Sequence, residues 1–209
     1  MQLMEDQAEM VAISPPSNQH EEVQRKKLFI SYSMDPYPVG TRSDRERRDD
    51  RRTQRRRVRA LADKLRQYGV DAWIDQYQEY IPPDSWTNWM EKQITKADYV
   101  LMICSPHYLE CVTGEKNEVA VFGHGVRFEG KVIYGQIANG RNLNKFIPVF
   151  FDKINLNHVP QFLRGAHMYG PIEDPPEYGK EKFDRLLFKL LGKQPANTLP
   201  QRLGRPPFQ

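Results

Sequence analysis

Short apolar runs, each bounded by charged or turn-forming residues, recur along the chain. They are shorter than typical helices, and several are continuously apolar, which is the pattern of strands buried on both faces of a sheet. The first run stops in hydroxyl and carboxyl side chains at Ser31, Ser33 and Asp35. The pattern predicts strands at residues 28–32, 70–74, 99–104 and 146–151, and a shorter fifth strand at 167–169.

The segments between these runs carry apolar residues at helical spacing. An amphipathic stripe over residues 58–65 ends near Gly69, where a helix would stop. Further helices are predicted after a cap at Ser85, from about Val126, and over the leucine-rich stretch 183–191. Because predicted strands alternate with predicted helices, we expect a parallel sheet with right-handed crossovers and helices on both faces.

Length and composition indicate one domain with tails. A chain of 209 residues is long enough to bury a self-sufficient core. Many of its 16 prolines fall outside the apolar runs. We expect a disordered N-terminal tail at residues 1–25, a domain over 26–193 and a proline-rich disordered tail at 194–209.

The net charge of +4 is concentrated in one segment. Residues 42–59 hold ten arginines against four acidic residues, a local charge of +6, so the rest of the chain carries −2. The chain therefore has no general basic character. The arginine-rich insertion, residues 36–57, is predicted either to form a helix with i, i+4 ion pairs or to remain a solvated, disordered linker.

Little in the sequence indicates metal or triad chemistry. Cys104 and Cys111 are the only cysteines, and we interpret them as reduced structural thiols. The five histidines are scattered, without HExxH or a Cys/His grouping. The N-terminus lacks a signal-peptide layout, and no run approaches the ~20 apolar residues that span a bilayer. We expect a cytoplasmic protein with no membrane span, no metal and no cofactor.

Six motifs in a fixed order carry a family resemblance. They are FISYSMD, GVDAWID, PPDSWTNWMEKQI, ADYVLMICSPHY, KFIPVFF and HVPQFLRGAHMYG. Together, over residues 26–193, they resemble the SEFIR domain, the cytoplasmic module of interleukin-17 receptors and their adaptor, a relative of the Toll/interleukin-1 receptor (TIR) domain. The resemblance implies a flavodoxin-like, three-layer α/β fold with a five-stranded parallel sheet. It also implies an innate-immunity signalling adaptor that works through homotypic association with SEFIR domains of receptor or adaptor, including its own.

The resemblance further implies a partner-binding surface on the helix capped by Ser85 and on the 75–85 loop. Carried onto this chain, its residues are Asp84, Trp86, Trp89, Glu91, Lys92 and Gln93. Helical geometry places Glu91 and Lys92 off the apolar stripe of that helix, where a partner can reach them. The two tryptophans lie on the stripe, and they can equally serve to pack the core. The arginine-rich insertion departs from the family, which usually has a short connection there.

An enzymatic alternative also follows from the resemblance. Some TIR relatives cleave NAD, as a substrate, with a glutamate on the helix before the fourth strand, and GVRFEG places Glu129 in that region. Such a reaction needs a carboxylate beside an oxocarbenium-like centre and an aromatic platform, for which Tyr32, Trp73 and Phe128 are candidates. Glu129 can equally be a solvated carboxylate on a helix surface.

Nucleic-acid binding is a third hypothesis, from another class of function. The arginine run of residues 42–59 has enough positive charge to follow phosphates. However, four acidic residues within it lower the field, and no aromatic residue interleaves with it. The sequence therefore favours a protein partner over nucleic acid.

Overall fold

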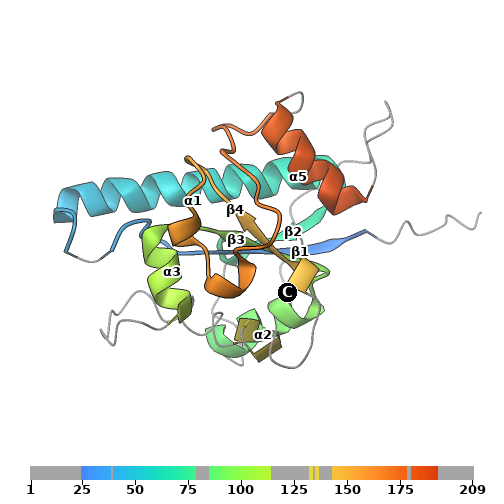
Figure 1. Ribbon diagram of the computed structural model, residues 1–209, viewed down its shortest axis with the longest axis horizontal. Coiled ribbons are helices and arrows are strands. Elements are labelled where there is room, and N and C mark those ends of the chain that lie inside the picture. Colours follow the sequence, from blue (N-terminus) through green and yellow to red (C-terminus); the bar gives the residue numbers. More distant parts are fainter. Residues whose placement is uncertain are drawn as a thin grey trace, which may run out of the picture.

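The computed structural model describes residues 25–38, 40–78, 85–113, 132–133, 135–136, 143–177 and 180–192, except the side chains at positions 86 and 87. Within these residues a four-stranded parallel sheet has the order β2-β1-β3-β4 (Figure 1). The strands are β1 (Lys27–Tyr32), β2 (Asp71–Trp73), β3 (Tyr99–Ile103) and β4 (Phe146–Val149). The first four predicted strands are confirmed, with ends that differ by one or two residues.

Helices cover both faces of the sheet (Figure 1). On one face, α1 (Asp44–Gln67) and α5 (Glu181–Leu191) pack with Leu28 and Ile30 of β1 in a single apolar cluster. On the other face, α2 (Trp86–Lys96) and α3 (Pro106–Thr113) pack with Phe29 in a second cluster. Successive side chains of a strand point to opposite faces, so a strand covered on both sides must be continuously apolar. This explains the uninterrupted runs in the sequence.

The predicted fifth strand is not confirmed, since within the described residues the segment 167–169 reaches the sheet only through an isolated bridge between Val149 and Tyr169. The Tyr169 amide donates to the Pro148 carbonyl at 3.0 Å, and the Phe150 amide donates to the Tyr169 carbonyl at 2.8 Å. The regular ladder is interrupted, because Gly170 has a φ of 145° and Pro171 has no amide proton, and the next bond, from the Ile172 amide to the Phe150 carbonyl at 2.9 Å, skips a residue. One extended residue is therefore all that this segment adds to the edge of β4.

The arginine-rich insertion is helical from Asp44, as an extension of the amphipathic helix predicted after it. Ser43 caps α1 through a capping box with Glu46, and Asp44 and Glu46 put negative charge in the first turn, where the helix dipole favours it. The 24 residues of α1 correspond to a rod about 36 Å long. No residue from 44 to 53 is buried, and Figure 1 shows this end of α1 reaching past the sheet.

Helix α3 was not predicted from the sequence. The Ser105 hydroxyl accepts a hydrogen bond from the Tyr108 amide at 3.1 Å, and Pro106 takes the first helical position. This Ser-Pro pair is a helix-start signal, so α3 was detectable. The helix predicted from about Val126 falls mostly outside the described residues, which show helical backbone at 132–133 and 135–136.

The described helices include none with the length and apolar character that a membrane crossing requires. Helix α1 is long enough, but it consists largely of arginine and acidic residues over its first half.

Candidate functional site

The carboxyl ends of β1 and β3 form the topological switch point of this sheet, because the chain order reverses between them. In open α/β folds this is where loops build binding sites. Five polar residues from these two strand ends are buried there: Ser31, Ser33, Asp35, Ser105 and His107. Buried polar groups require partners, so the contacts of these residues show what the site can do.

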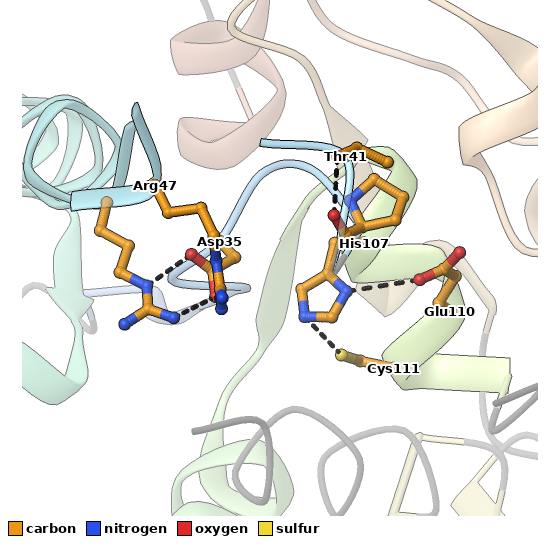
Figure 2. Close-up of polar contacts among 8 residues, drawn as sticks. Asp35, Thr41, Arg47, His107, Glu110 and Cys111 are labelled. Carbon is orange, nitrogen blue, oxygen red and sulfur yellow. Dashed lines mark hydrogen bonds and ion pairs between the residues drawn. The ribbon is translucent and has the colours of Figure 1, made fainter. Parts of the chain in front are cut away.

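Asp35 is held by two arginines of α1 (Figure 2). Arg51 makes a bidentate pair with it, Nε to Oδ1 at 2.5 Å and Nη2 to Oδ2 at 2.6 Å, while Arg47 Nη2 lies 3.4 Å from Oδ2. Burial alone would raise the pKa of the Asp35 carboxyl, but the hydrogen bonds and charges of Arg51 and Arg47 outweigh it and lower the pKa. The hydrogen bond to Asp35 also raises the pKa of Arg51. Asp35 is thus a fixed anion that anchors the insertion to the end of β1.

His107 lies between a carboxylate and a thiol on the same helix, as Figure 2 shows. Its Nδ1 is 3.4 Å from Glu110 Oε2, and its Nε2 is 3.6 Å from Cys111 Sγ. Its backbone amide donates to the Pro36 carbonyl at 3.5 Å, which ties α3 to the loop after β1. His107 and Cys111 are both buried, and a reactive thiolate needs partial exposure. We therefore assign the group a structural role.

A second contact joins β1 to α3. Ser31 Oγ and the Tyr108 hydroxyl are 2.9 Å apart, both buried, although 77 positions separate them in the sequence. The thiol of Cys104, nearby at the end of β3, has its pKa raised to about 12 by burial. Cys104 and Cys111 are both buried and neither forms a disulfide, which agrees with the sequence-based interpretation of both as reduced thiols.

Tyr32 faces the loop after β2 rather than an open site. Its hydroxyl donates to Asp75 Oδ1 at 2.8 Å and accepts from Gln76 Nε2 at 3.0 Å. Burial raises the pKa of Asp75, although the Tyr32 hydrogen bond and the Arg55 charge lower it in part. Burial and the Asp75 carboxylate raise the pKa of Tyr32 itself. Because Tyr32 is only 6% exposed, it is not available as an aromatic platform for a ligand.

Helix α2 carries most of the predicted partner-binding residues. Trp89 is 9% exposed and packs edge-on against Phe29, with ring centroids 6.1 Å apart, so it belongs to the core. Glu91 and Lys92 are exposed on the opposite side of the helix. Trp86 opens α2, and its side chain lies outside the described residues, as does Asp84. The structure thus presents two charged residues of the predicted surface to solvent.

Gln93 is half-buried beside a small pocket of about 130 Å³ at the amino ends of β1 and β2. Lys27, Asp71, Trp73 and Lys96 also line the pocket. The Trp73 indole donates to the Asp71 carboxylate at 3.1 Å, so this candidate platform is engaged at the opposite end of the sheet from Asp35. Glu129 and Phe128 lie outside the described residues.

Comparison with known proteins gives the family. The family model of the TIR domain matches residues 51–187 of this chain. The chain belongs to the TIR domain family. A solved structure, a prokaryotic SEFIR domain, is 25% identical and superposes with a TM-score of 0.51, covering 84% of this chain and 97% of that one. These matches confirm the prediction, made from the ordered motifs, that the chain is a SEFIR- or TIR-like domain.

The TIR match begins inside α1, at Arg51, and therefore includes the residue that holds Asp35. Residues 42–50, which carry the first arginines of the insertion, precede the matched range. The amino-terminal turns of α1, like β1, thus lie before the range that the family model matches.

Proposed function

We propose that this chain is a signalling adaptor that binds other SEFIR domains, of receptors or of further copies of itself, in an interleukin-17-receptor-type pathway of innate immunity. Membership of the TIR family and similarity to a SEFIR domain support homotypic association. Within this proposal, the opening YSMD, the HVP with a later HMY and the proline-rich tail favour a protein similar to the SEFIR adaptor CIKS. A cytoplasmic location belongs to the same proposal.

The observation that carries the surface assignment is the division of α2 into two sides. Trp89, Met90 and Ile94 are buried against the sheet, while Glu91 and Lys92 are exposed. Charged side chains at the rim of an interface contribute association rate and specificity more than affinity. Helix α2 can therefore supply specific contacts to a partner without disturbing the core.

A charge exchange tests this surface. The variant Glu91→Lys with Lys92→Glu keeps the net charge and the apolar side of α2, so we expect a folded protein with weakened association. Association is measured by pull-down of a second tagged copy and of a receptor SEFIR domain. The matched control exchanges two exposed charges elsewhere, Lys153→Glu with Glu173→Lys. Unchanged binding by the folded α2 variant would reject this surface.

An assay of nicotinamide release from NAD distinguishes the enzymatic alternative, NAD cleavage through Glu129, from the adaptor function. The described residues offer it no open platform at Tyr32, whose ring is buried. We expect no nicotinamide release from NAD at high protein concentration. Turnover that disappears in the Glu129→Ala variant would establish the enzyme instead.

A further inference from the structure

The structure divides the arginines of residues 42–59 into two groups. Six contact carboxylates of the same chain within 4.0 Å: Arg42, Arg47, Arg51, Arg56, Arg57 and Arg59. The other four are Arg45, Arg48, Arg52 and Arg55, here called the arginine stripe. Across the part of the chain that the structure describes, no guanidinium group of the stripe forms an ion pair or a hydrogen bond.

The arginine stripe runs along one side of α1. Its members are separated by three, four and three positions, so at 3.6 residues per turn they fall within about 80° of one another and share one helix face. At 1.5 Å per residue the stripe is about 15 Å long, with steps of about 4.5 and 6 Å. Arg45, Arg48 and Arg52 are exposed and Arg55 is half-buried.

Asp35 holds this part of α1 in place from another side. Arg47 and Arg51, which bind Asp35, lie about 100° around the helix from the centre of the stripe. Since no residue from 44 to 53 is buried, Arg45, Arg48 and Arg52 stand on a section of helix that projects from the core and is fixed by ion pairs. These three members of the stripe are therefore both held in place and accessible.

Neighbouring arginines of the stripe carry like charges at short helical spacing. Arg48 and Arg52 are four positions apart, and Arg45 and Arg48 three, which is close enough for their charges to repel. Within the described residues no carboxylate lies at ion-pair distance from the stripe, although the Arg55 charge acts on the buried Asp75 from further away. We propose that the arginine stripe is a docking surface for an acidic α-helix of a partner protein.

The spacing and the borders of the stripe favour an acidic helix. A helix with Glu or Asp at i, i+3 and i+7 repeats its charges at the same steps as the stripe, so two helices lying alongside can pair each charge. The exposed carboxylates of Asp44 and Asp49 border the stripe on its two sides. They would repel the phosphates of a nucleic-acid duplex, whereas they can pair with lysines that flank the acidic row of a helix. Arginine also suits carboxylates, because its planar fork binds them bidentately.

The arginine stripe is distinct from the partner-binding surface proposed at Glu91 and Lys92 of α2. Helix α1 packs in the apolar cluster on one face of the sheet, and α2 packs in the cluster on the other face. A partner bound at Glu91 and Lys92 therefore leaves the stripe open to a second protein. Such an arrangement suits an adaptor that joins two partners.

The test uses the full chain and a labelled helical peptide of about 20 residues with Glu at i, i+3, i+7 and i+10. Binding is followed by fluorescence anisotropy at about 0.05 and 0.2 M salt. We expect the peptide to bind, more weakly at high salt, and the triple variant Arg45→Gln, Arg48→Gln, Arg52→Gln to lose about ten-fold in affinity. Its melting temperature should change little, because within the described residues the three guanidinium groups form no ion pair or hydrogen bond.

Two comparisons make the test specific. The control variant Lys153→Gln, Arg164→Gln, Lys180→Gln loses the same charge from exposed positions off α1 and should bind normally. A peptide with Gln in place of Glu should not bind. Equal affinity of the stripe variant and the unmodified protein would overturn the proposal. So would tighter, stripe-dependent binding of a mixed-sequence DNA duplex, which would assign the stripe to nucleic acid.

Discussion

Arg51 of α1 binds the Asp35 carboxylate with two nitrogens of its guanidinium group: Nε lies 2.5 Å from Oδ1, and Nη2 lies 2.6 Å from Oδ2. The pair joins a carboxylate at the end of β1 to a helix residue 16 positions later, across the loop where the insertion begins. Bidentate arginine–carboxylate pairs are among the stronger charged contacts because they fix geometry as well as charge. This contact orients the projecting end of α1, including the arginine stripe.

Replacing Asp35 by Asn should loosen the start of α1. The change removes the charge that Arg51 and Arg47 bind, and we expect unfolding free energy to fall by about 1–3 kcal/mol. Amide exchange should accelerate mainly over residues 44–53, which have no buried side chain to hold them. Asp152→Asn is the control, because the Asp152 carboxylate is 84% exposed and also pairs with an arginine, Arg57. Equal effects of the two variants would contradict the anchoring role.

Asp35 and Asp75 should affect stability in opposite pH ranges. The folded state lowers the pKa of Asp35, so its contribution is present above the unfolded pKa of about 4 and is lost as pH falls through the lower folded value. Burial raises the pKa of Asp75, so its contribution is present below about pH 4 and is lost as pH rises through the higher folded value.

The variant Asp75→Asn tests the pH dependence of stability that the raised pKa of Asp75 causes. The introduced amide would keep an oxygen for the Tyr32 hydroxyl but cannot ionise, so the stability of the variant relative to the unmodified protein should increase as pH rises from about 4. Urea unfolding at several pH values between about 4 and 7 measures this difference. A difference that stays constant with pH would show that Asp75 has no raised pKa. For Asp35→Asn, the deficit should shrink as pH falls below about 4.

Gly170 should not tolerate a side chain. A Cβ atom at this position would lie 2.5 Å from the Phe150 carbonyl oxygen, and φ is 145°, which side chains rarely adopt. We expect Gly170→Ala to cost about 2–4 kcal/mol in thermal or urea unfolding. Gly165→Ala is the control, because open space surrounds that position, and its effect should stay within about 0.5 kcal/mol. Similar losses in both variants would contradict the close approach of the 169–172 segment to β4.

Substitution of Trp89 distinguishes a role in core packing from a role in partner binding. Since the indole is buried against Phe29, Trp89→Ala should lower unfolding free energy by about 3–5 kcal/mol. Association measured per folded molecule should change little, whereas the Glu91 and Lys92 exchange should weaken it without loss of stability. A stable Trp89→Ala protein that no longer associates would place Trp89 at the interface.

The sequence predicted the elements better than their contacts. The runs at 28–32 and 99–104 and the stripe at 58–65 were sufficient to locate β1, β3 and the buried part of α1, because burial imposes a period on the residues themselves. The fifth strand predicted at residues 167–169 was not confirmed, because the sequence of an extended segment does not show over how many residues its backbone pairs with a neighbouring strand. Helix α3 was overlooked, although Ser105 and Pro106 signal its start.

For the candidate site, the sequence identified residue types but could not assign their partners. It indicated that Asp35 closes a strand and that arginines crowd residues 42–59. Which two of those arginines bind Asp35, and which four remain on an open stripe, depends on how α1 is rotated and where it crosses β1. The Ser31 and Tyr108 pair depends likewise on the packing of α3.

By itself the sequence determined the alternation of strands and helices, the apolar core and the SEFIR and TIR character, because these follow from local periodicity and the order of motifs. Tertiary structure decided that Trp89 is buried, that Tyr32 is closed to ligands and that the arginines divide into anchors and an open stripe. The physical reason is that a side chain's role is set by what packing brings within a few ångströms of it. For Asp35 those neighbours come from residues 12 and 16 positions further along the chain.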